Sequence, residues 1–418
     1  YTPDDFLLLS VQGLSTLKFG TSASKPPPLP LGTEHSDVLE AVGLMHQLDT
    51  AATAGDADAG YAVLHTVATH LLPTSQKGPP VCLVWALHTY ALWTKLLLRG
   101  VSLMEREGKY VDALHYLGVG LASPIKPPHY LRGELWRRTV VDLQHVGSLT
   151  HALDTAEKAL QDPAVIGETR QGIETSVSRL AVPPRRWRSP KLPTRQVAPT
   201  ITLHRSADTK LRVEAFALAE LLGQRGAGWC GQHAENSAVL TLFALLFWEV
   251  LFPGDDQGGP AAATPLPTRF HDLPADMALG LPLDAFDVSF VEARRDLTQR
   301  VLARIVAGEA PAMVRDCLDR HGGTVCRGVD WRRYSADTLV ALAKGLGPRV
   351  LGACCRKLVE GYRVWRHGLP DLLLWREDGG GVFMAEVKGP GDSLRPAQIM
   401  WIDLLVSEGA EVALVLVT

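Results

Sequence analysis

The sequence predicts an α-helical, repeat-like N-terminal part followed by a C-terminal α/β domain with a mixed sheet. Apolar residues recur at helical spacing through most of residues 36–178, and a proline-broken basic segment follows at 179–210. The last fifty residues alternate short apolar runs with one helical stretch. We therefore divide the chain into an irregular segment (1–35, containing K-P-P-P-L-P-L-G), a helical domain (36–178), a basic linker (179–210) and an α/β domain (211–418).

The overall composition is that of an ordinary globular protein. Of the 418 residues 46% are hydrophobic and 21% are charged, and the formal net charge is -3, so a nucleic-acid-binding surface must be a local basic patch. The six cysteines form no C-x-x-C pair, which fits reduced thiols in an intracellular protein. The longest apolar run, 238–252, is too short for a membrane span, and we expect a buried helix and no membrane partner. The chain begins at Tyr1 rather than methionine, so we expect it to be a trimmed fragment.

The helical domain shows a repeated pattern. Residues 85–108 and 110–123 form one predicted helix pair, and 131–147 and 149–163 form a second. In both pairs a G-K or G-S turn leads into a helix that begins near an Ala-Leu pair. This pattern resembles tetratricopeptide repeats, which are antiparallel helical hairpins. An irregular helical bundle is the alternative.

The segment 179–210 is strongly basic. One acid, Asp208, accompanies eight basic residues, and Trp187 lies among the arginines. Basic residues interleaved with an aromatic are suited to hold phosphates and stack a base, although a solvated linker explains the composition equally well. The basic residues are Arg179, Arg185, Arg186, Arg188, Lys191, Arg195, Arg205 and Lys210.

Two predicted strands near the C-terminus, 371–375 and 382–388, flank Asp378-Gly379. Such a pair favours a two-residue type I′ hairpin turn. A turn centred there fixes the register of the two strands, and in this register Asp371 lies directly opposite Glu386. A longer turn would slip the register by one residue and separate the two acids.

Three residues of this hairpin carry chemistry. Two adjacent carboxylates, Asp371 and Glu386, both stay ionised only with a cation between them, and oxygen ligands suit Mg²⁺ or Mn²⁺. Lys388 lies on the same face as Glu386 and can offset charge that develops at a phosphate. The alternative, a surface hairpin with ordinary charges, is less economical because both strands are otherwise apolar. A metal site for phosphodiester hydrolysis is therefore predicted.

The run G-L-P-D-L-L-L-W, followed by A-E-V-K-G-P-G-D-S-L and Q-I-M-W, resembles the PD-(D/E)xK nuclease superfamily. More narrowly, it looks like the VRR-type nuclease domain of the Fanconi-anaemia-associated nuclease family. The resemblance implies that the α/β domain is a restriction-endonuclease-like nuclease domain. It also implies that the backbone carbonyl of Val387 completes the metal shell. The signature residues fall on Asp371, Glu386, Lys388, Gln398 and Trp401.

The resemblance extends upstream of the hairpin. The run H-A-E-N-S-A-V-L resembles the start of a family helix and implies that Glu235 is a third metal-binding acid, whereas the residues alone indicate a helix-dipole partner. The run L-R-G-E-L-W-R-R resembles a phosphate-binding segment, from which Glu134 and Leu135 depart. Candidate DNA-binding residues are Arg132, Arg137, Arg138, Arg185, Arg186, Arg188 and Arg395; for Arg395 a structural role is favoured over a phosphate contact.

The resemblance implies a structure-selective DNA nuclease that cuts flapped or branched DNA, as a 5′-flap endonuclease and 5′→3′ exonuclease, in interstrand-crosslink repair. It also implies Mg²⁺ or Mn²⁺ as cofactor. Repair proteins are expected to bind the helical domain or a segment preceding Tyr1. A eukaryotic protein of this kind would be nuclear, and any other would be cytoplasmic. The alternatives are a Holliday-junction resolvase or general exonuclease with the same centre, and a helical scaffold with an inert nuclease domain.

Overall fold

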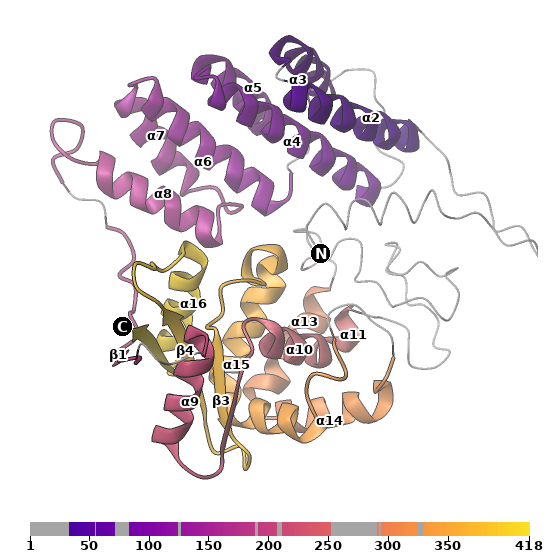
Figure 1. Ribbon diagram of the computed structural model, residues 1–418. Helices are drawn as coiled ribbons and strands as arrows, with labels where there is room; N and C mark the ends of the chain where they lie inside the picture. The colour runs from indigo at the N-terminus through magenta and orange to yellow at the C-terminus, as the bar shows by residue number, and fades with distance from the viewer. Residues whose placement is uncertain are drawn as a thin grey trace, which may run out of the picture.

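The molecule consists of a helical part followed along the chain by an α/β part (Figure 1). The computed structural model describes residues 33–54, 56–71, 83–123, 127–188, 191–206, 211–251, 291, 294–324 and 329–418. The predicted irregular segment 1–35 lies outside these ranges except for residues 33–35, which begin a helix. The Gly-, Ala- and Pro-rich run 253–268, whose composition indicates a loop, also lies outside them.

The helical part is a stack of antiparallel helices in which consecutive helices pack together (Figure 1). The predicted repeat-like helical architecture is confirmed. The helices are α2 (Thr33–Ala54), α3 (Ala57–Leu71), α4 (Leu83–Arg106), α5 (Tyr110–Ala122), α6 (His129–His145), α7 (Leu149–Ala159) and α8 (Gly167–Leu180).

Glycines in the left-handed region end the first helix of each predicted pair. Gly108 has φ 73° and Gly147 has φ 77°. The next residue donates its N–H to a carbonyl five residues earlier, with 2.9 Å between Lys109 N and Met104 O. A side chain is disfavoured at this φ, and this bond satisfies a carbonyl that the helix leaves unpaired. The G-K and G-S positions are therefore helix ends that turn the chain back.

The α/β part is built on a five-stranded sheet with the order β1-β5-β4-β3-β2. β1, β5 and β4 run parallel, whereas β4, β3 and β2 run antiparallel, so the predicted mixed sheet is confirmed. The strands are β1 (Thr200–Leu203), β2 (Trp229–His233), β3 (Leu372–Arg376), β4 (Val382–Lys388) and β5 (Glu411–Val417).

Helices cover both faces of this sheet. Alternate residues of β3 and β4 face opposite sides. Leu372 and Phe383 pack with α9, whereas Leu373 and Met384 pack with α10, α15 and α16. The helices are α9 (Val213–Arg225), α10 (Ser237–Leu246), α11 (Trp248–Leu251), α13 (Arg295–Val306), α14 (Ala310–His321), α15 (Ala336–Trp365) and α16 (Pro396–Ser407). Glu386 follows the parity of Met384, so it belongs to the face covered by α16.

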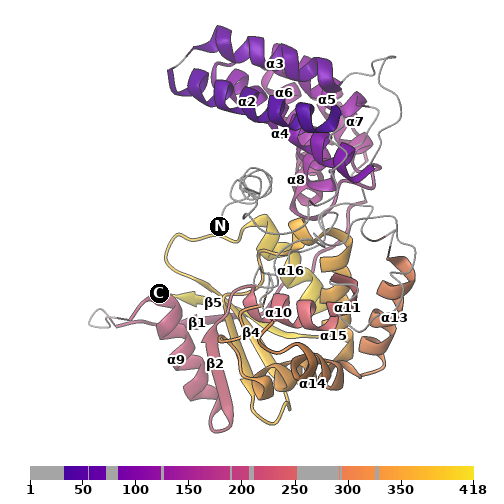
Figure 2. The same ribbon diagram turned by 90° about the vertical axis from the view of Figure 1, so that its right-hand side faces the viewer.

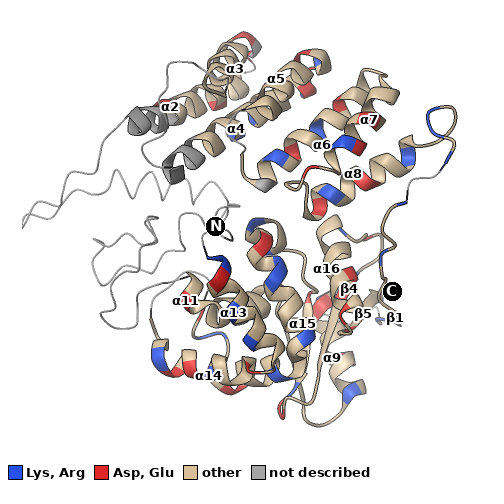
Figure 3. Ribbon diagram, turned by 180° about the vertical axis from the view of Figure 1, so that it is seen from behind, with Lys and Arg blue, Asp and Glu red and all other residues tan. Residues whose placement is uncertain are grey.

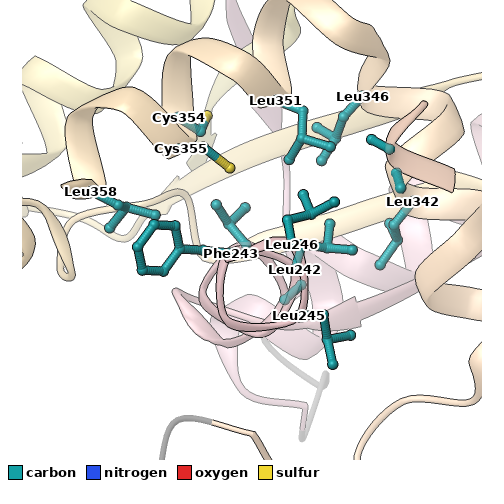
Figure 4. Packing of buried hydrophobic residues seen from close by; sticks show 14 of the residues in the cluster. Leu242, Phe243, Leu245, Leu246, Leu342, Leu346, Leu351, Cys354, Cys355 and Leu358 are labelled. Carbon is teal, nitrogen blue, oxygen red and sulfur yellow. The ribbon is translucent and has the colours of Figure 1, made fainter. Parts of the chain in front are cut away.

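The largest core lies between α10 and α15. Leu242 and Leu246 of α10 pack with Leu346 and Leu351 of α15 (Figure 4). Within the apolar run 238–252, residues 238–251 are helical and mostly buried, as predicted, but they form two helices, α10 and α11, which are separated at Phe247. Among the described residues α15 is the one helix long and apolar enough to cross a membrane, and most of that apolar window is buried in this core.

Two strands were not predicted. The predicted basic linker 179–210 contributes β1, which pairs in parallel with β5. Residues 229–233 form β2, an edge strand that pairs with β3. Its sequence, W-C-G-Q-H, is not the alternating apolar pattern of an isolated strand signal. Both edge strands are short and are specified by their neighbours in the sheet more than by their own residues.

The predicted type I′ turn is wrong, although the register is right. The Arg376 N–H donates to Gly381 O at 3.0 Å, so the loop contains four residues, 377–380. Of the described residues other than glycine, Glu235 alone has a positive φ, so Asp378 is not in the region that a type I′ turn requires. The longer loop has the same centre as the predicted one, and therefore no register slip occurs.

The two parts of the molecule meet at α8. In Figures 1 and 2 α8 lies against α16 and the C-terminal end of α15, whereas α2 and α3 extend away from the α/β part. The approach is close at Gly167 (φ 60°), where a Cβ atom would lie 1.9 Å from Val364 Cγ1. A larger residue at position 167 would push α8 off α15, so this glycine permits the contact.

Candidate active site

The β3–β4 hairpin brings Asp371 and Glu386 together. Leu373 pairs with Met384, and this register continues to Asp371, which immediately precedes β3 and faces Glu386. The Val387 N–H donates to Asp371 Oδ2 at 3.0 Å, which ties the Asp371 carboxylate to the opposite strand. The predicted juxtaposition of the two acids is therefore present.

Glu386 is a fully buried carboxylate with incomplete hydrogen bonding. Lys388 Nζ donates to Glu386 Oε1 at 2.7 Å, and Gln398 Nε2 donates to the same oxygen at 2.5 Å. Within the described part of the chain Glu386 Oε2 has no hydrogen-bond partner. Burial raises the pKa of Glu386 to about 7, the negative charge of Asp371 adds to this effect, and Lys388 opposes it.

This donor set fits a divalent cation. Lys388 pairs with one oxygen of the buried Glu386 carboxylate, but among the described residues the other oxygen has no hydrogen-bond partner and a second carboxylate lies nearby, so a further positive charge would stabilise the ionised form. Oxygen donors of this kind suit Mg²⁺ or Mn²⁺. The backbone of Val387, the residue after Glu386, is held next to the Asp371 carboxylate because its N–H donates to Asp371 Oδ2.

Glu235 contacts Asp371 through its backbone. The N–H groups of Ala234 and Glu235 donate to Asp371 O at 3.0 and 3.1 Å. Glu235 has φ 46°, a strained value for a residue with a side chain. Its carboxylate is 62% exposed and lies 3.7 Å from His233 Nε2. In the described ranges no group of three His, Cys, Asp or Glu side chains is gathered to hold a metal, so a role for Glu235 as third acid stays a prediction.

Helix α16 supports both acids. Gln398 Oε1 accepts the Arg395 N–H at 2.9 Å, which directs the Gln398 NH₂ group toward Glu386. The Trp401 indole N–H donates to His367 O at 2.9 Å and Trp365 O at 3.1 Å, in the segment that leads to Asp371. Arg395 begins the helix as its N-cap, the structural role left open for it by the sequence.

The predicted phosphate-binding arginines of α6 have intramolecular partners. Arg132 Nε lies 2.7 Å from Asp162 Oδ2, and its side chain is 11% exposed. Arg137 and Arg138 both pair with Glu134, at 2.6 and 2.9 Å. In Figure 3 both basic (blue) and acidic (red) positions occur along the ribbon of α6. The glutamate that departs from the family pattern thus neutralises the adjacent arginines, and their part in DNA binding stays a prediction.

A cationic group that the sequence motifs did not single out lies at the end of α15. Arg363 Nη1 donates to Tyr130 OH at 3.0 Å. Among the described residues nothing bonds the buried Arg366 Nε. Burial lowers the pKa of Arg366, aided by the charge of Arg363, and burial together with Arg366 lowers the pKa of His367. The R-V-W-R-H run directly before G-L-P-D was the available signal.

The hairpin, the mixed sheet and the Asp371/Glu386/Lys388 arrangement define a restriction-endonuclease-like nuclease domain of the PD-(D/E)xK type. Residues 307–418 match the VRR-NUC domain family, in agreement with this class.

Relatives extend the match beyond that domain. The chain is 31% identical over 362 residues to the Fanconi-associated nuclease 1 homolog of Oryza sativa subsp. japonica, covering 81% of this chain and 35% of that protein. It is 33% identical over 343 residues to the Arabidopsis thaliana homolog, covering 76% and 36%. These matches support the Fanconi-associated nuclease 1 family and confirm the resemblance. The chain spans about a third of the length of these relatives.

A solved structure shares the fold. The crystal structure of paFAN1 bound to 5′-flap DNA with a 2-nucleotide flap and a gap superposes with a TM-score of 0.71. The match covers 99% of this chain and 67% of that one, at 19% sequence identity. The helical part and the nuclease domain are therefore arranged in a fold that both proteins have.

Proposed function

We propose that this chain is a structure-selective DNA nuclease that hydrolyses phosphodiesters in flapped or branched DNA. The observation that carries the proposal is the buried Glu386 carboxylate beside Asp371 and Lys388, in a domain of the VRR-NUC family. The DNA in the paFAN1 structure is a 5′ flap, which supports this substrate class. Curated relatives are named as Fanconi-associated nucleases, which supports a role in interstrand-crosslink repair and a nuclear location.

A nuclease of this family implies a divalent metal cofactor. We propose Mg²⁺ or Mn²⁺, held by the carboxylates of Asp371 and Glu386, the carbonyl of Val387 and, as third acid, Glu235. When bound, this ion supplies a Lewis acid that polarises a phosphate oxygen and lowers the pKa of water.

The residues of the chain position the reacting groups. Lys388 is hydrogen-bonded to Glu386 and is 12% exposed, so its ammonium group is fixed close to the carboxylates. From there it can stabilise negative charge on the scissile phosphate or orient the attacking water. Arg366 precedes Asp371 by five residues and its buried Nε has no hydrogen-bond partner among the described residues, so this group is available to donate to a phosphate of the DNA backbone.

The test uses end-labelled flap, splayed-arm and four-way DNA in Mg²⁺ or Mn²⁺. We expect the wild type to cut flapped substrates, and Asp371→Asn and Lys388→Ala to lower cleavage at least about 100-fold, the typical effect of losing one charged catalytic group. Both variants should bind DNA nearly as the wild type does, because phosphate contacts elsewhere carry binding.

Asp378→Asn is the matched control. Asp378 lies on the same hairpin but pairs with Arg376 at the loop, so its loss should leave cleavage unchanged. Substantial cleavage by Asp371→Asn would contradict the assignment. Preference for four-way junctions with a dimeric enzyme would favour a resolvase, and an inert wild type that binds DNA would favour a scaffold.

A further inference from the structure

Helix α16 contacts three parts of the molecule at once. Near its start, Gln398 donates to Glu386. In its middle, Trp401 holds the carbonyls of Trp365 and His367 ahead of Asp371. Two residues later, Asp403 faces away from the site toward the segment that connects the helical part to the sheet. The same rigid element thus supports the catalytic acids and touches the connection between the two parts.

The contact at Asp403 is a chain of charged hydrogen bonds, which we call the latch: Glu174, Arg195, Gln196 and Asp403. The Gln196 N–H donates to Asp403 Oδ1 at 2.6 Å, and Arg195 Nη1 lies 3.5 Å from Asp403 Oδ2. Arg195 Nη2 also donates to Glu174 Oε2 at 2.5 Å. Glu174 belongs to α8, so the latch joins the helical part, the connecting segment and α16.

The side chains of the latch are buried or partly buried, which favours one paired arrangement of their charges. The Glu174 side chain is 8% exposed, and those of Arg195 and Asp403 are 22% and 25% exposed. A buried charge that loses its partner is strongly destabilised, so the paired arrangement is favoured over displaced ones. The packing of α8 on α16 keeps the two elements together while these bonds form. A displacement of α8 therefore acts on α16 at Asp403.

We propose that Arg195 and Asp403 are positioning residues, which transmit the placement of the helical part through α16 to Gln398 and the Glu386 carboxylate. The proposal rests on the proposed nuclease function. Gln398 and Asp403 are five residues apart on one helix, about 7.5 Å along its axis, a distance over which a helix moves as a unit. DNA that spans the helical part and the active site would thereby couple its own binding to the alignment of Glu386.

The first test separates catalysis from binding. We expect Asp403→Ala to lower kcat about fivefold, in the range of substitutions along a coupling network, with unchanged KM for a 5′ flap. Asp403→Asn keeps an oxygen that accepts the Gln196 N–H and should restore part of the rate. Glu408→Ala is the matched control, because Glu408 lies at the end of the same helix but pairs with Arg349 of α15 at 2.9 Å, and it should leave kcat unchanged.

The second test asks whether Asp403 acts through Gln398. If it does, the rate losses of Asp403→Ala and Gln398→Ala will not multiply in the double variant, whereas independent effects multiply. Multiplying losses, or a kcat for Asp403→Ala equal to that of the wild type, would overturn the proposal while leaving the nuclease function intact.

Backbone hydrogen exchange supplies a measurement that needs no activity. In the protein without DNA, Asp403→Ala should speed exchange of the amides of 386–388 and 397–400, because α16 loses its fixed position, and Glu408→Ala should not. Unchanged exchange at 386–388 in Asp403→Ala would overturn the proposal about Asp403, whatever the activity of the wild type. Failure of the wild type to cut DNA would instead overturn the proposed nuclease function, so the two failures are distinguishable.

Discussion

Three acidic side chains are buried in the described part of the molecule, and they differ in their hydrogen-bond partners. Glu174 pairs with Arg170 and Arg195. Glu386 accepts hydrogen bonds from Lys388 and Gln398. Asp142 of α6 is 1% exposed, and among the described residues neither of its oxygens has a hydrogen-bond partner. Asp142 is therefore a buried carboxyl whose ionisation the helical part does not support.

The protonation of Asp142 makes stability depend on pH. Burial raises its pKa to about 7, the charge of Glu105 adds to this, and Arg138 and Arg137 oppose it. Because the folded pKa lies above the unfolded value of about 3.9, its contribution to the free energy of unfolding is full below pH ~4. That contribution is lost as pH rises through about 7.

We expect Asp142→Asn to remove this loss. At pH 8 the variant should melt about 2–4 °C above the wild type, the shift that ~1 kcal/mol produces in a domain of 150–250 residues, and at pH 4 the difference should vanish or reverse. Thermal melts followed by circular dichroism at pH 4, 6 and 8 measure this. Asp154→Asn, at an exposed position on α7, is the control. Equal pH profiles for Asp142→Asn and the wild type would show that Asp142 is ionised without penalty.

At the scale of elements, the sequence predicted those strands that have a strong local pattern of apolar residues. β3, β4 and β5 are strongly apolar, and the position of Asp378-Gly379 gave the pairing of Asp371 with Glu386 even though the turn type was wrong. β1 and β2 were missed because each forms by pairing with a strand about 140–215 residues away along the chain. No local pattern carries such a contact.

The partners of the basic residues were equally beyond the sequence. Arg138 pairs with Glu105 on α4, 33 residues away, and Arg132 pairs with Asp162, 30 residues away. Basic side chains near a motif suggest a phosphate site in the sequence, but the fold can pair them with acidic residues that are distant along the chain. Asp371 and Glu386, by contrast, lie on one hairpin, where their spacing in the sequence is enough to bring them together.

The helix-ending glycines give a prediction at this scale. Gly147→Ala should lower the free energy of unfolding by about 1–2 kcal/mol, because φ 77° is unfavourable for any residue with a Cβ atom. Gly118→Ala is the matched control: Gly118 lies within α5, where a Cβ atom meets nothing within 4 Å, and the change should stabilise the protein by ~0.5–1 kcal/mol. Urea unfolding measures both. A neutral Gly147→Ala would mean that the turn rearranges without loss of the helix pair.

At the scale of the whole molecule, positive charge must be concentrated locally because the net charge is -3. The loop after α8 is one such concentration, visible as blue ribbon in Figure 3. Within it, Arg185 Nε donates to Leu180 O, and Arg186 pairs with Glu157 of α7. These two arginines are therefore engaged in holding the loop. Trp187 is 80% exposed, and Arg188 and Lys191 are exposed as well.

We therefore expect the double variant Arg188→Glu with Lys191→Glu to weaken binding to every DNA sequence alike. The slope of log affinity against log salt concentration should become shallower by about two, since each lost phosphate contact removes ~0.9 from it. Binding titrations from 50 to 200 mM salt measure this. Arg304→Glu with Arg315→Glu, on α13 and α14 away from this loop, changes the net charge equally and is the control. If both double variants lose the same affinity, DNA responds only to net charge. If the loop variant loses none, 179–210 is a connector that supplies β1 and the residues Arg195 and Gln196 of the latch, and the phosphate contacts must come from other residues.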